Sequence, residues 1–234
     1  RSYPDSWFFD RSKESWRDKK ELFTSIDDSN MVIVTPSEWL AGLVKKSYLQ
    51  KYSIHVINNG IDLDVFKPTE SDFRRKYNLK DKYVVLGVAM GFEKRKGSEY
   101  FIKLSKILSN DFQIVLVGVS GRIKKEIPDN IIAFEKTNNI EELVEIYTAA
   151  DVFVNPTLED NFPTVNLEAL ACGTPVITFN TGGSVECIDE TCGMIVEKGN
   201  VDKLAEAIKK IRKGKIDPQM CVARAKMYSK KIKF

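Results

Sequence analysis

The sequence contains no long apolar run. The longest extends from Tyr83 to Phe92 and covers ten residues, two of them glycine, whereas a bilayer-spanning helix needs about 20 apolar residues. A transmembrane helix is therefore not expected. The chain also starts with Arg1 rather than methionine and has no secretory signal pattern, so we expect a fragment or a processed product of a longer protein.

Cysteine and histidine are scarce. The 234 residues include four cysteines, no C-x-x-C pair and one histidine, His55. A zinc site needs three or four nitrogen or sulfur ligands at characteristic spacing, and this pattern is absent. Because no secretion signal is present, we expect reduced thiols that pack as small apolar groups, as is typical of a cytoplasmic protein.

No charge of one sign dominates the chain. Lys and Arg number 36, Asp and Glu 33, and the formal net charge is +3. Residues Val201–Phe234 nevertheless hold 11 basic and 3 acidic side chains, a balance of +8, which leaves −5 for the rest. This basic segment fits a solvated helix face, or contact with an anionic membrane surface or another polyanion. It lacks interleaved aromatic residues and any DNA-binding motif, so we expect no nucleic-acid partner.

Apolar segments of strand length alternate with segments of helical periodicity between about residues 80 and 213. The predicted strands are apolar throughout, which indicates burial on both faces of a sheet: Tyr83–Ala89, Phe112–Val117, Ile131–Phe134, Asp151–Val154, Pro175–Phe179 and Gly193–Val196. The predicted helices are Gly97–Leu108, Asn139–Ala150, Pro163–Ala171 and Asn200–Arg212. This alternation predicts an α/β domain with a doubly wound parallel sheet, which binds ligands at the carboxyl ends of its strands.

The first 80 residues carry fewer elements. We predict two helices and two strands there: Ser12–Ile26, Pro36–Ser47, Met31–Thr35 and Ile54–Ile57. These are too few for a sheet domain with its own core, so we expect the tail of a larger domain whose earlier strands are missing. The aromatic run Trp7–Phe9 is expected to pack on that missing part or to form a partner surface. At the other end, Ile216–Phe234 is predicted as one basic helix that begins around Pro218.

The segment Asn155–Pro175, NPTLEDNFPTVNLEALACGTP, combines a strand end, an acidic loop and a helix start. Pro163 suits the first helical position, and the backbone N–H groups that follow can bind anions or hydroxyls. Asp160 and Glu168, with seven residues between them, can both line one crevice at a strand end. The alternative is that Asp160 only caps the helix and Glu168 is solvated.

A second segment, Gly87–Gly97 or GVAMGFEKRKG, runs from a strand through a glycine-containing loop to Arg95 and Lys96. Basic side chains beside a helix start can hold phosphate oxygens, although a solvated turn fits the segment as well. The segment is neither a Walker loop nor G-x-G-x-x-G, and this disfavours a dinucleotide-dependent oxidoreductase.

Taken together, the segments resemble the retaining glycosyltransferases of family four, which have the GT-B fold. The resemblance rests on VTPSEWL at 34–40, VINNGIDLDVFKP at 56–68, LGVA and RKG within 86–97, the block from Tyr147 to Gly183, and GMIVEKGN at 193–200. The segments follow one another in the family's order and span most of the chain after residue 30.

The resemblance implies a domain organisation. Residues 1–66 are expected to be the remnant of an N-terminal acceptor domain together with the interdomain linker. Residues 67–213 are expected to be the Rossmann-like domain that binds a nucleotide-sugar donor. Residues 214–234 are expected to be the basic C-terminal helix that crosses back to the first domain.

It also implies roles for particular residues. Asp160, Glu168 and Lys96 are the catalytic candidates: Asp160 faces the donor sugar, Glu168 accepts hydrogen bonds from the ribose hydroxyls, and Lys96 with Arg95 neutralises the diphosphate. The family usually has Glu where this chain has Asp160, and adjacent Glu159 is the second choice. The other residues expected to bind the donor are Asn161, Phe162, Thr164 and Val165 around the helix start, and Gly118, Ala133 and Phe134 near the nucleotide base of the donor.

The implied function is hexosyl transfer with retention of configuration, from a UDP- or GDP-linked sugar to a glycan or lipid-linked acceptor in cell-surface polysaccharide biosynthesis. No metal and no other cofactor are expected. The protein is expected in the cytoplasm, with peripheral contact to the inner face of the membrane through its basic C-terminal segment. The alternative is a non-catalytic nucleotide-sugar-binding fragment that lacks the acceptor domain.

Overall fold

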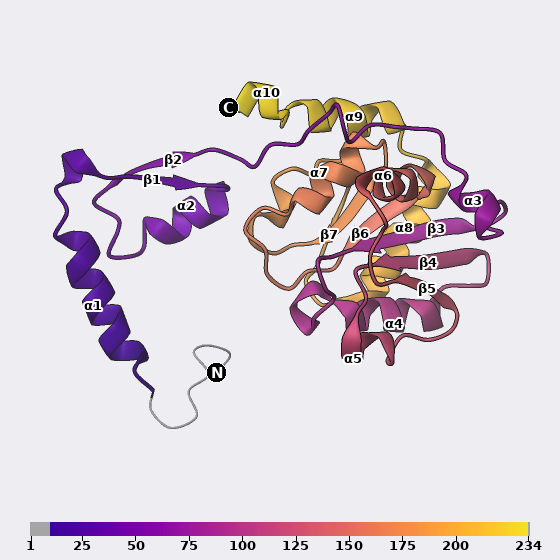
Figure 1. Ribbon diagram of the computed structural model, residues 1–234, viewed down its shortest axis with the longest axis horizontal. Helices are drawn as coiled ribbons and strands as arrows, with labels where there is room; N and C mark the ends of the chain where they lie inside the picture. Colours follow the sequence, from indigo (N-terminus) through magenta and orange to yellow (C-terminus); the bar gives the residue numbers. More distant parts are fainter. Residues whose placement is uncertain (1–9, 234) are drawn as a thin grey trace. The chain divides into compact units, whose positions relative to one another are not determined.

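The computed structural model describes residues 10–233, except for the side chains of Arg122, Ile232 and Lys233. The chain divides into two compact units, with the division between Ile57 and Asn58 (Figure 1). The aromatic run Trp7–Phe9 lies outside the described residues. No helix in the described part of the chain is long and apolar enough to cross a membrane.

The smaller unit holds two strands and two α-helices. Its elements are α1 (Ser12–Thr24), the 3₁₀ helix η1 (Asp28–Asn30), β1 (Val32–Thr35), α2 (Glu38–Val44) and β2 (Ser53–Val56). The strands pair in parallel, with Val34 opposite His55, and the Ser37 hydroxyl caps α2 by accepting from the Leu40 N–H at 3.1 Å. Val32 and Val34 are 58% and 56% exposed, so one face of β1 is open.

The larger unit is built on a six-stranded sheet in which every pairing is parallel. Its strands are β3 (Tyr83–Val88), β4 (Phe112–Val117), β5 (Ile131–Phe134), β6 (Val152–Asn155), β7 (Val176–Phe179) and β8 (Gly193–Val196). Their order across the sheet is β5-β4-β3-β6-β7-β8. The chain therefore reverses its direction of winding between β3 and β6, and such a switch point opens a crevice at the strand ends.

Helices cover both faces of this sheet (Figure 1). The helices of this unit are α3 (Phe73–Lys76), η2 (Lys94–Lys96), α4 (Ser98–Ile107), α5 (Gly121–Lys124), α6 (Ile140–Ala149), α7 (Thr164–Ala171), η3 (Gly182–Val185), α8 (Val201–Gly214), α9 (Pro218–Lys226) and α10 (Lys230–Lys233). Alternate strand residues face opposite ways: Val84 and Leu86 pack with α6, α7 and α9, whereas Val85 packs with α4 and α8. This double burial explains why the strands are apolar throughout.

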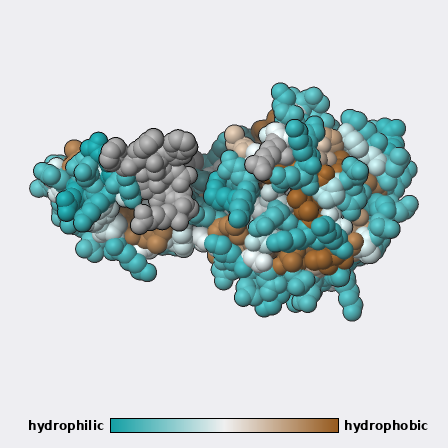
Figure 2. Space-filling model, turned by 90° about the horizontal axis from the view of Figure 1, so that it is seen from below, coloured by the Kyte–Doolittle hydropathy of each residue, from teal (hydrophilic) through white to brown (hydrophobic). Residues whose placement is uncertain are grey.

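The outer surface differs from these cores. In Figure 2 it is mostly hydrophilic, with separate hydrophobic patches. All four cysteines are buried and unpaired by disulfides, which agrees with the expectation that they pack as apolar groups. The large apolar side chains that remain exposed in the larger unit include Met90, Ile195 and Met227.

The C-terminal segment differs from its prediction as a single helix. It forms α9 and α10, separated at residues 227–229. The helix breaks because its backbone pairs with the linker instead: the Ile61 N–H donates to the Tyr228 carbonyl at 2.8 Å, and the Lys230 N–H donates to the Ile61 carbonyl at 3.0 Å. Ile61 and Phe66 belong to the core of the larger unit, so the linker predicted within residues 1–66 packs with this unit, and the division of the chain lies before it. The short helices α3 and α5 were not predicted.

Candidate active site

A cleft of about 310 Å³ lies at the carboxyl ends of β3 and β6. It is lined by the last residues of these two strands, the loops that follow them, the start of α7 and one residue of the linker: Asn59, Val88, Ala89, Met90, Phe92, Lys96, Val154, Asn155, Pro156, Asp160, Phe162, Pro163, Thr164 and Val165. β3 and β6 are the neighbours at the switch point of the sheet, so the topology positions this cleft as a ligand site.

Lys96 and Asp160 form an ion pair in the cleft. The Lys96 Nζ lies 2.6 Å from an Asp160 carboxylate oxygen, and the two side chains are 25% and 14% exposed. Lys96 ends η2, and Gly97 then adopts a left-handed φ of 77°. A Cβ on Gly97 would lie 2.3 Å from the Pro156 carbonyl oxygen, so only glycine allows Lys96 to approach the loop after β6 this closely.

The loop that carries Asp160 is held from two sides through its backbone. On one side, the Arg95 guanidinium donates to the Glu159 carbonyl at 2.9 Å, and the Leu158 N–H donates to the Arg95 carbonyl at 2.8 Å. On the other side, the Gly183 N–H donates to the Asp160 carbonyl at 3.0 Å. Arg95 itself is exposed and lies outside the cleft lining, and the Glu159 side chain is exposed as well. The structure therefore uses Arg95 to position the loop.

The start of α7 has no side-chain cap. Pro163 occupies the N-cap position, one residue before the first helical position at which it was predicted, and no side chain accepts a capping hydrogen bond. Asp160 pairs with Lys96 instead, which contradicts the alternative that it only caps the helix. The first N–H groups of a helix lack intrahelical acceptors and carry partial positive charge. Because Thr164 and Val165 line the cleft, this helix start faces the ligand space.

Glu168 lies one turn further along α7, half-buried and outside the cleft lining. Its carboxylate accepts a hydrogen bond of 2.9 Å from the Tyr147 hydroxyl and another from the Thr164 side chain. Burial raises the pKa of Glu168 above its ordinary value, and these two hydrogen bonds offset part of that rise. Hydroxyl donors are therefore the partners of the Glu168 carboxylate, and the alternative of a fully solvated side chain is excluded.

The residues expected near the base lie at the ends of β4 and β5. The Gly118 and Val119 N–H groups both donate to the Phe134 carbonyl at 2.9 Å, and Ala133 is paired with Leu116 across the strands. Gly118 has a φ of 101°, and a Cβ there would lie 1.7 Å from the Ala89 carbonyl oxygen. Gly118 thus contacts a residue of the cleft lining, although Gly118, Ala133, Phe134 and exposed Asn161 do not line the cleft themselves.

Two groups of polar residues at the cleft escaped the prediction. Asn59 lines the cleft, and its side-chain amide donates to the Phe162 carbonyl at 3.1 Å. Asn155 lines the cleft as well. It donates to Asn166 at 2.8 Å, and Asn166 donates to the Ser184 carbonyl at 3.0 Å, all within buried residues. A sequence signal existed for this network, because Asn155 ends an apolar strand and Asn166 interrupts an apolar helix. Buried amides of this kind require partners.

Within the described residues, no three His, Cys, Asp or Glu side chains lie close enough together to hold a metal ion. The carboxylate of Asp160 is engaged by the cation of Lys96. The charged groups that the cleft offers to an anionic ligand are therefore those of Lys96 and the α7 start.

A sequence model described as "Glycosyl transferases group 1" matches residues 69–228, which is most of the chain and all six strands of the large sheet. The chain belongs to the group 1 glycosyl transferases. The predicted family is thereby confirmed. Residues 69–228 also contain Lys96, Asp160 and Glu168, so the candidate site lies inside the matched region.

Individual members of the family show the same relationship. The chain is 26% identical over 205 residues to the D-inositol 3-phosphate glycosyltransferase of Mycobacteroides abscessus, covering 81% of this chain and 46% of that protein. It is 30% identical over 166 residues to the capsular polysaccharide biosynthesis glycosyltransferase CapM of Staphylococcus aureus, covering 66% and 43%. The chain spans about half the length of these curated relatives.

The fold of this group 1 glycosyltransferase is also that of solved structures. The structure of Anabaena HepE in complex with UDP-glucose superimposes with a TM-score of 0.74 at 19% identity, covering 93% of this chain and 63% of HepE. The predicted α/β architecture of the GT-B type is confirmed.

Proposed function

We propose that the cleft of this group 1 glycosyltransferase binds the diphosphate and sugar of a UDP- or GDP-linked donor, and that the protein transfers the sugar to a glycan or lipid-linked acceptor with retention of configuration. The observation that carries the proposal is the Lys96–Asp160 pair beside the start of α7, at the switch point of the sheet. A cation and a helix N-terminus at this place suit a diphosphate. HepE, which has a similar fold, was crystallised with UDP-glucose.

The proposed chemistry follows from the charges in the cleft. When the bond between the anomeric carbon and the diphosphate breaks, negative charge develops on the leaving phosphate. Lys96 and the first N–H groups of α7 stabilise that charge. In the free protein the Lys96 cation is paired with the Asp160 carboxylate. The diphosphate takes the place of this carboxylate on Lys96. The Asp160 carboxylate is then released toward the donor sugar.

Glu168 and the reacting carbon complete the proposal. Glu168 accepts hydrogen bonds from the ribose hydroxyls. The acceptor oxygen bonds to the anomeric carbon on the face that the diphosphate leaves, through an oxocarbenium-like transition state, and its proton passes to the leaving diphosphate oxygen. Attack on this face retains the configuration. A hexose is the proposed sugar. No side-chain nucleophile and no metal ion take part in the proposed step.

The acceptor side of the proposal concerns membranes. One relative, from Staphylococcus aureus, is named for capsular polysaccharide biosynthesis, and we propose a glycan or lipid-linked acceptor at the inner face of the cytoplasmic membrane. The basic C-terminal segment would contact anionic lipids there. Part of its charge is already balanced, because Lys230 and Lys231 pair with Asp62 and Asp64. Lys209, Lys210 and Lys213 on α8 are exposed and supply the contact.

Calorimetric titration with UDP and with GDP tests the donor site. We expect Lys96→Ala to weaken binding of the nucleotide about 10- to 100-fold, because a hydrogen bond to a charged group contributes about 1.5–3 kcal/mol. Lys94→Ala is the matched control, since Lys94 is an exposed lysine of the same η2 turn, and it should change the affinity less than about twofold.

Two outcomes would contradict the donor site: no binding of either nucleotide to the folded protein at millimolar concentration, or equal effects of the two lysine substitutions. An assay of glycosyl transfer and donor hydrolysis distinguishes the enzyme from the alternative, a non-catalytic binding module. Turnover that Lys96→Ala abolishes and Lys94→Ala retains supports the enzyme, whereas nucleotide binding without turnover supports the module.

A further inference from the structure

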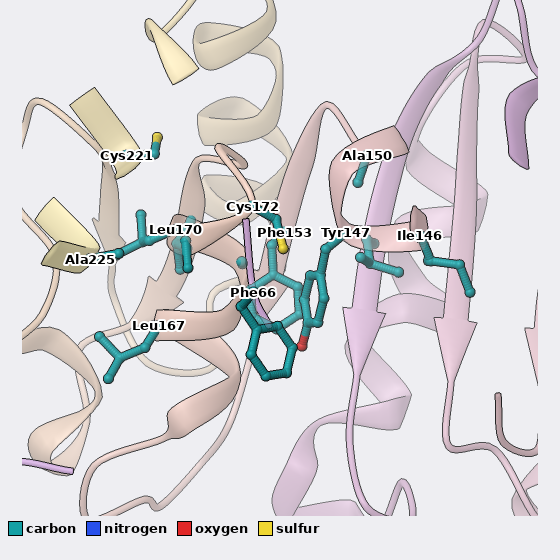
Figure 3. Close-up of a cluster of buried hydrophobic side chains, with 14 of the residues drawn as sticks. Phe66, Ile146, Tyr147, Ala150, Phe153, Leu167, Leu170, Cys172, Cys221 and Ala225 are labelled. Atoms are coloured by element: carbon teal, nitrogen blue, oxygen red, sulfur yellow. The ribbon is translucent and has the colours of Figure 1, made fainter. Parts of the chain in front are cut away.

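The hydroxyl of Tyr147 is a polar group inside an apolar cluster. Tyr147 lies on α6 and is fully buried among the side chains between the sheet and helices α6, α7 and α9 (Figure 3). Its hydroxyl donates to a Glu168 carboxylate oxygen at 2.9 Å. A buried hydroxyl without a partner is costly, so this hydrogen bond satisfies Tyr147 and at the same time fixes one oxygen of Glu168.

The ring of Tyr147 cannot easily move. It packs edge-on against Phe153 of β6, with 5.7 Å between ring centroids, and against Phe66 of the linker, with 6.4 Å. Figure 3 shows the three rings together, with the Tyr147 oxygen at their edge. The Tyr147 carbonyl also accepts from the Thr174 hydroxyl at 2.6 Å. The position of the hydroxyl is therefore set by β6, the linker and the loop before β7, independently of Glu168.

Glu168 depends on hydroxyl donors. None of the ion pairs found among the described side chains of residues 10–233 includes it. Burial raises the pKa of Tyr147 well above its ordinary value, so the proton stays on the phenol and the carboxylate is the acceptor. A carboxylate offers about four lone-pair positions. Tyr147 and Thr164 use two of them, and the remaining ones are available to other hydroxyls.

We propose that Tyr147 is a positioning residue, whose hydroxyl holds the Glu168 carboxylate in the orientation that accepts the ribose hydroxyls of the donor nucleotide. This inference rests on the proposed function, in which Glu168 binds the ribose. A half-buried carboxylate aimed by a fixed donor discriminates strongly, because a ligand that lacks the hydroxyl leaves the acceptor unpaired. Without the Tyr147 hydrogen bond the carboxylate turns more freely and this discrimination declines.

The experiment compares a ribonucleotide with its deoxy analogue. Calorimetry gives the affinities of UDP and 2′-deoxy-UDP, or of GDP and 2′-deoxy-GDP where GDP is the nucleotide that binds. We expect the wild-type protein to prefer the ribonucleotide at least about 10-fold. In Tyr147→Phe, which keeps the ring, the preference should fall to about threefold or less, while the affinity for the deoxynucleotide stays within about threefold of the wild type.

Two controls separate positioning from general damage. Tyr228→Phe removes a hydroxyl that donates to the Glu186 carbonyl at 3.1 Å, away from Glu168, and it should keep the ribose preference. Inorganic pyrophosphate has no ribose, and its affinity for Tyr147→Phe should equal that for the wild type. A melting curve of each variant reports its folding.

The outcomes are distinct. A preference that is unchanged in folded Tyr147→Phe overturns the positioning role and leaves the donor site in place. A wild-type protein that binds the ribonucleotide and the deoxynucleotide equally overturns the ribose role of Glu168 and with it the role of Tyr147. If no nucleotide binds, the donor site itself is wrong. A loss of preference confined to Tyr147→Phe supports the inference.

Discussion

The loop at 156–163 and the helix α7 that follows it each hold one of the two carboxylates predicted to be catalytic, and the surroundings of these two acids differ. Asp160, in the loop, is paired with the Lys96 cation at 2.6 Å. Glu168, on the helix, has two hydroxyl partners, Tyr147 and Thr164, and its pKa is raised by burial. The sequence motif of two acids does not reveal this difference between Asp160 and Glu168.

This difference suits the different ligand groups that the proposed function gives to the two acids. The Asp160 carboxylate competes with anionic ligands for Lys96, because an anion that binds the Lys96 cation must displace it. The Glu168 carboxylate suits hydroxyl groups of a ligand, since its partners in the protein are neutral hydroxyl donors and not a cation. Under the proposed function, Asp160 of the loop would face the donor sugar and Glu168 of the helix would face the ribose.

The largest effect is expected from a change that moves the loop and leaves the helix in place. A Cβ on Gly182, with φ of 53°, would lie 2.0 Å from the Asp160 carbonyl oxygen. Gly182→Ala should therefore cost about 3 kcal/mol or more, from backbone strain plus the clash, and lower the melting temperature by at least about 6 °C. It should also abolish nucleotide binding measured by calorimetry, because Asp160 and the cleft shift.

Gly121 provides the matched control for this substitution. Its φ of 55° is nearly the same, but nothing lies within 4 Å of an added Cβ. Gly121→Ala should cost only about 1 kcal/mol of strain and keep nucleotide binding. Equal losses of stability in the two variants would mean that the contact between Gly182 and the Asp160 backbone does not hold the loop.

A moderate effect is expected when the charge of Asp160 is removed while its shape is kept. In Asp160→Asn the Lys96 cation is no longer neutralised, so UDP or GDP should bind about 2- to 10-fold more tightly, while sugar transfer becomes slower. Calorimetry and a transfer assay measure the two quantities on the same protein. Weaker nucleotide binding by Asp160→Asn would show that the carboxylate attracts the ligand and does not compete with it for Lys96.

The smallest effect is expected in the pH dependence of the protein's stability, to which Glu168 contributes. Its pKa in the folded protein is raised above 4.5 by burial, so the ionised side chain opposes folding. This destabilisation is fully present above the pKa that Glu168 has in the folded protein, and it disappears as the pH falls toward 4.5. Tyr147 and Cys172, the titratable neighbours, stay protonated in this range because burial raises the pKa of Tyr147 well above 10 and that of Cys172 to about 12.

Glu168→Gln makes this dependence measurable. The amide oxygen still accepts from Tyr147 but does not ionise, so the variant should gain melting temperature relative to the wild type at pH 8, and the gain should shrink toward pH 5. Glu159→Gln, at an exposed position of the loop, serves as the control and should show no such trend. A difference that grows as the pH falls would contradict the raised pKa.

Much of the larger unit was predictable from local pattern. The six strands of its sheet and the helices α4, α6, α7 and α8 lie where apolar runs and helical periodicity placed them. Spacing and neighbours singled out the two acids, Lys96 and the helix start, and the family resemblance supplied their expected roles. The break between α9 and α10 was not predictable, because it depends on hydrogen bonds between Ile61 and the backbone around Tyr228, which are far apart in the sequence.

The sequence by itself determined the class of fold, the family and the residues that carry charge at the ends of two strands. These follow from local composition and order, which act within a few residues. Only the tertiary structure decided the partners of those residues: Lys96 meets Asp160 across 64 positions, Arg95 turns to the loop backbone, and Tyr147 meets Glu168 across 21 positions. Hydrogen bonds and ion pairs act over a few ångströms, so the parallel sheet has to bring these side chains together before their chemistry exists.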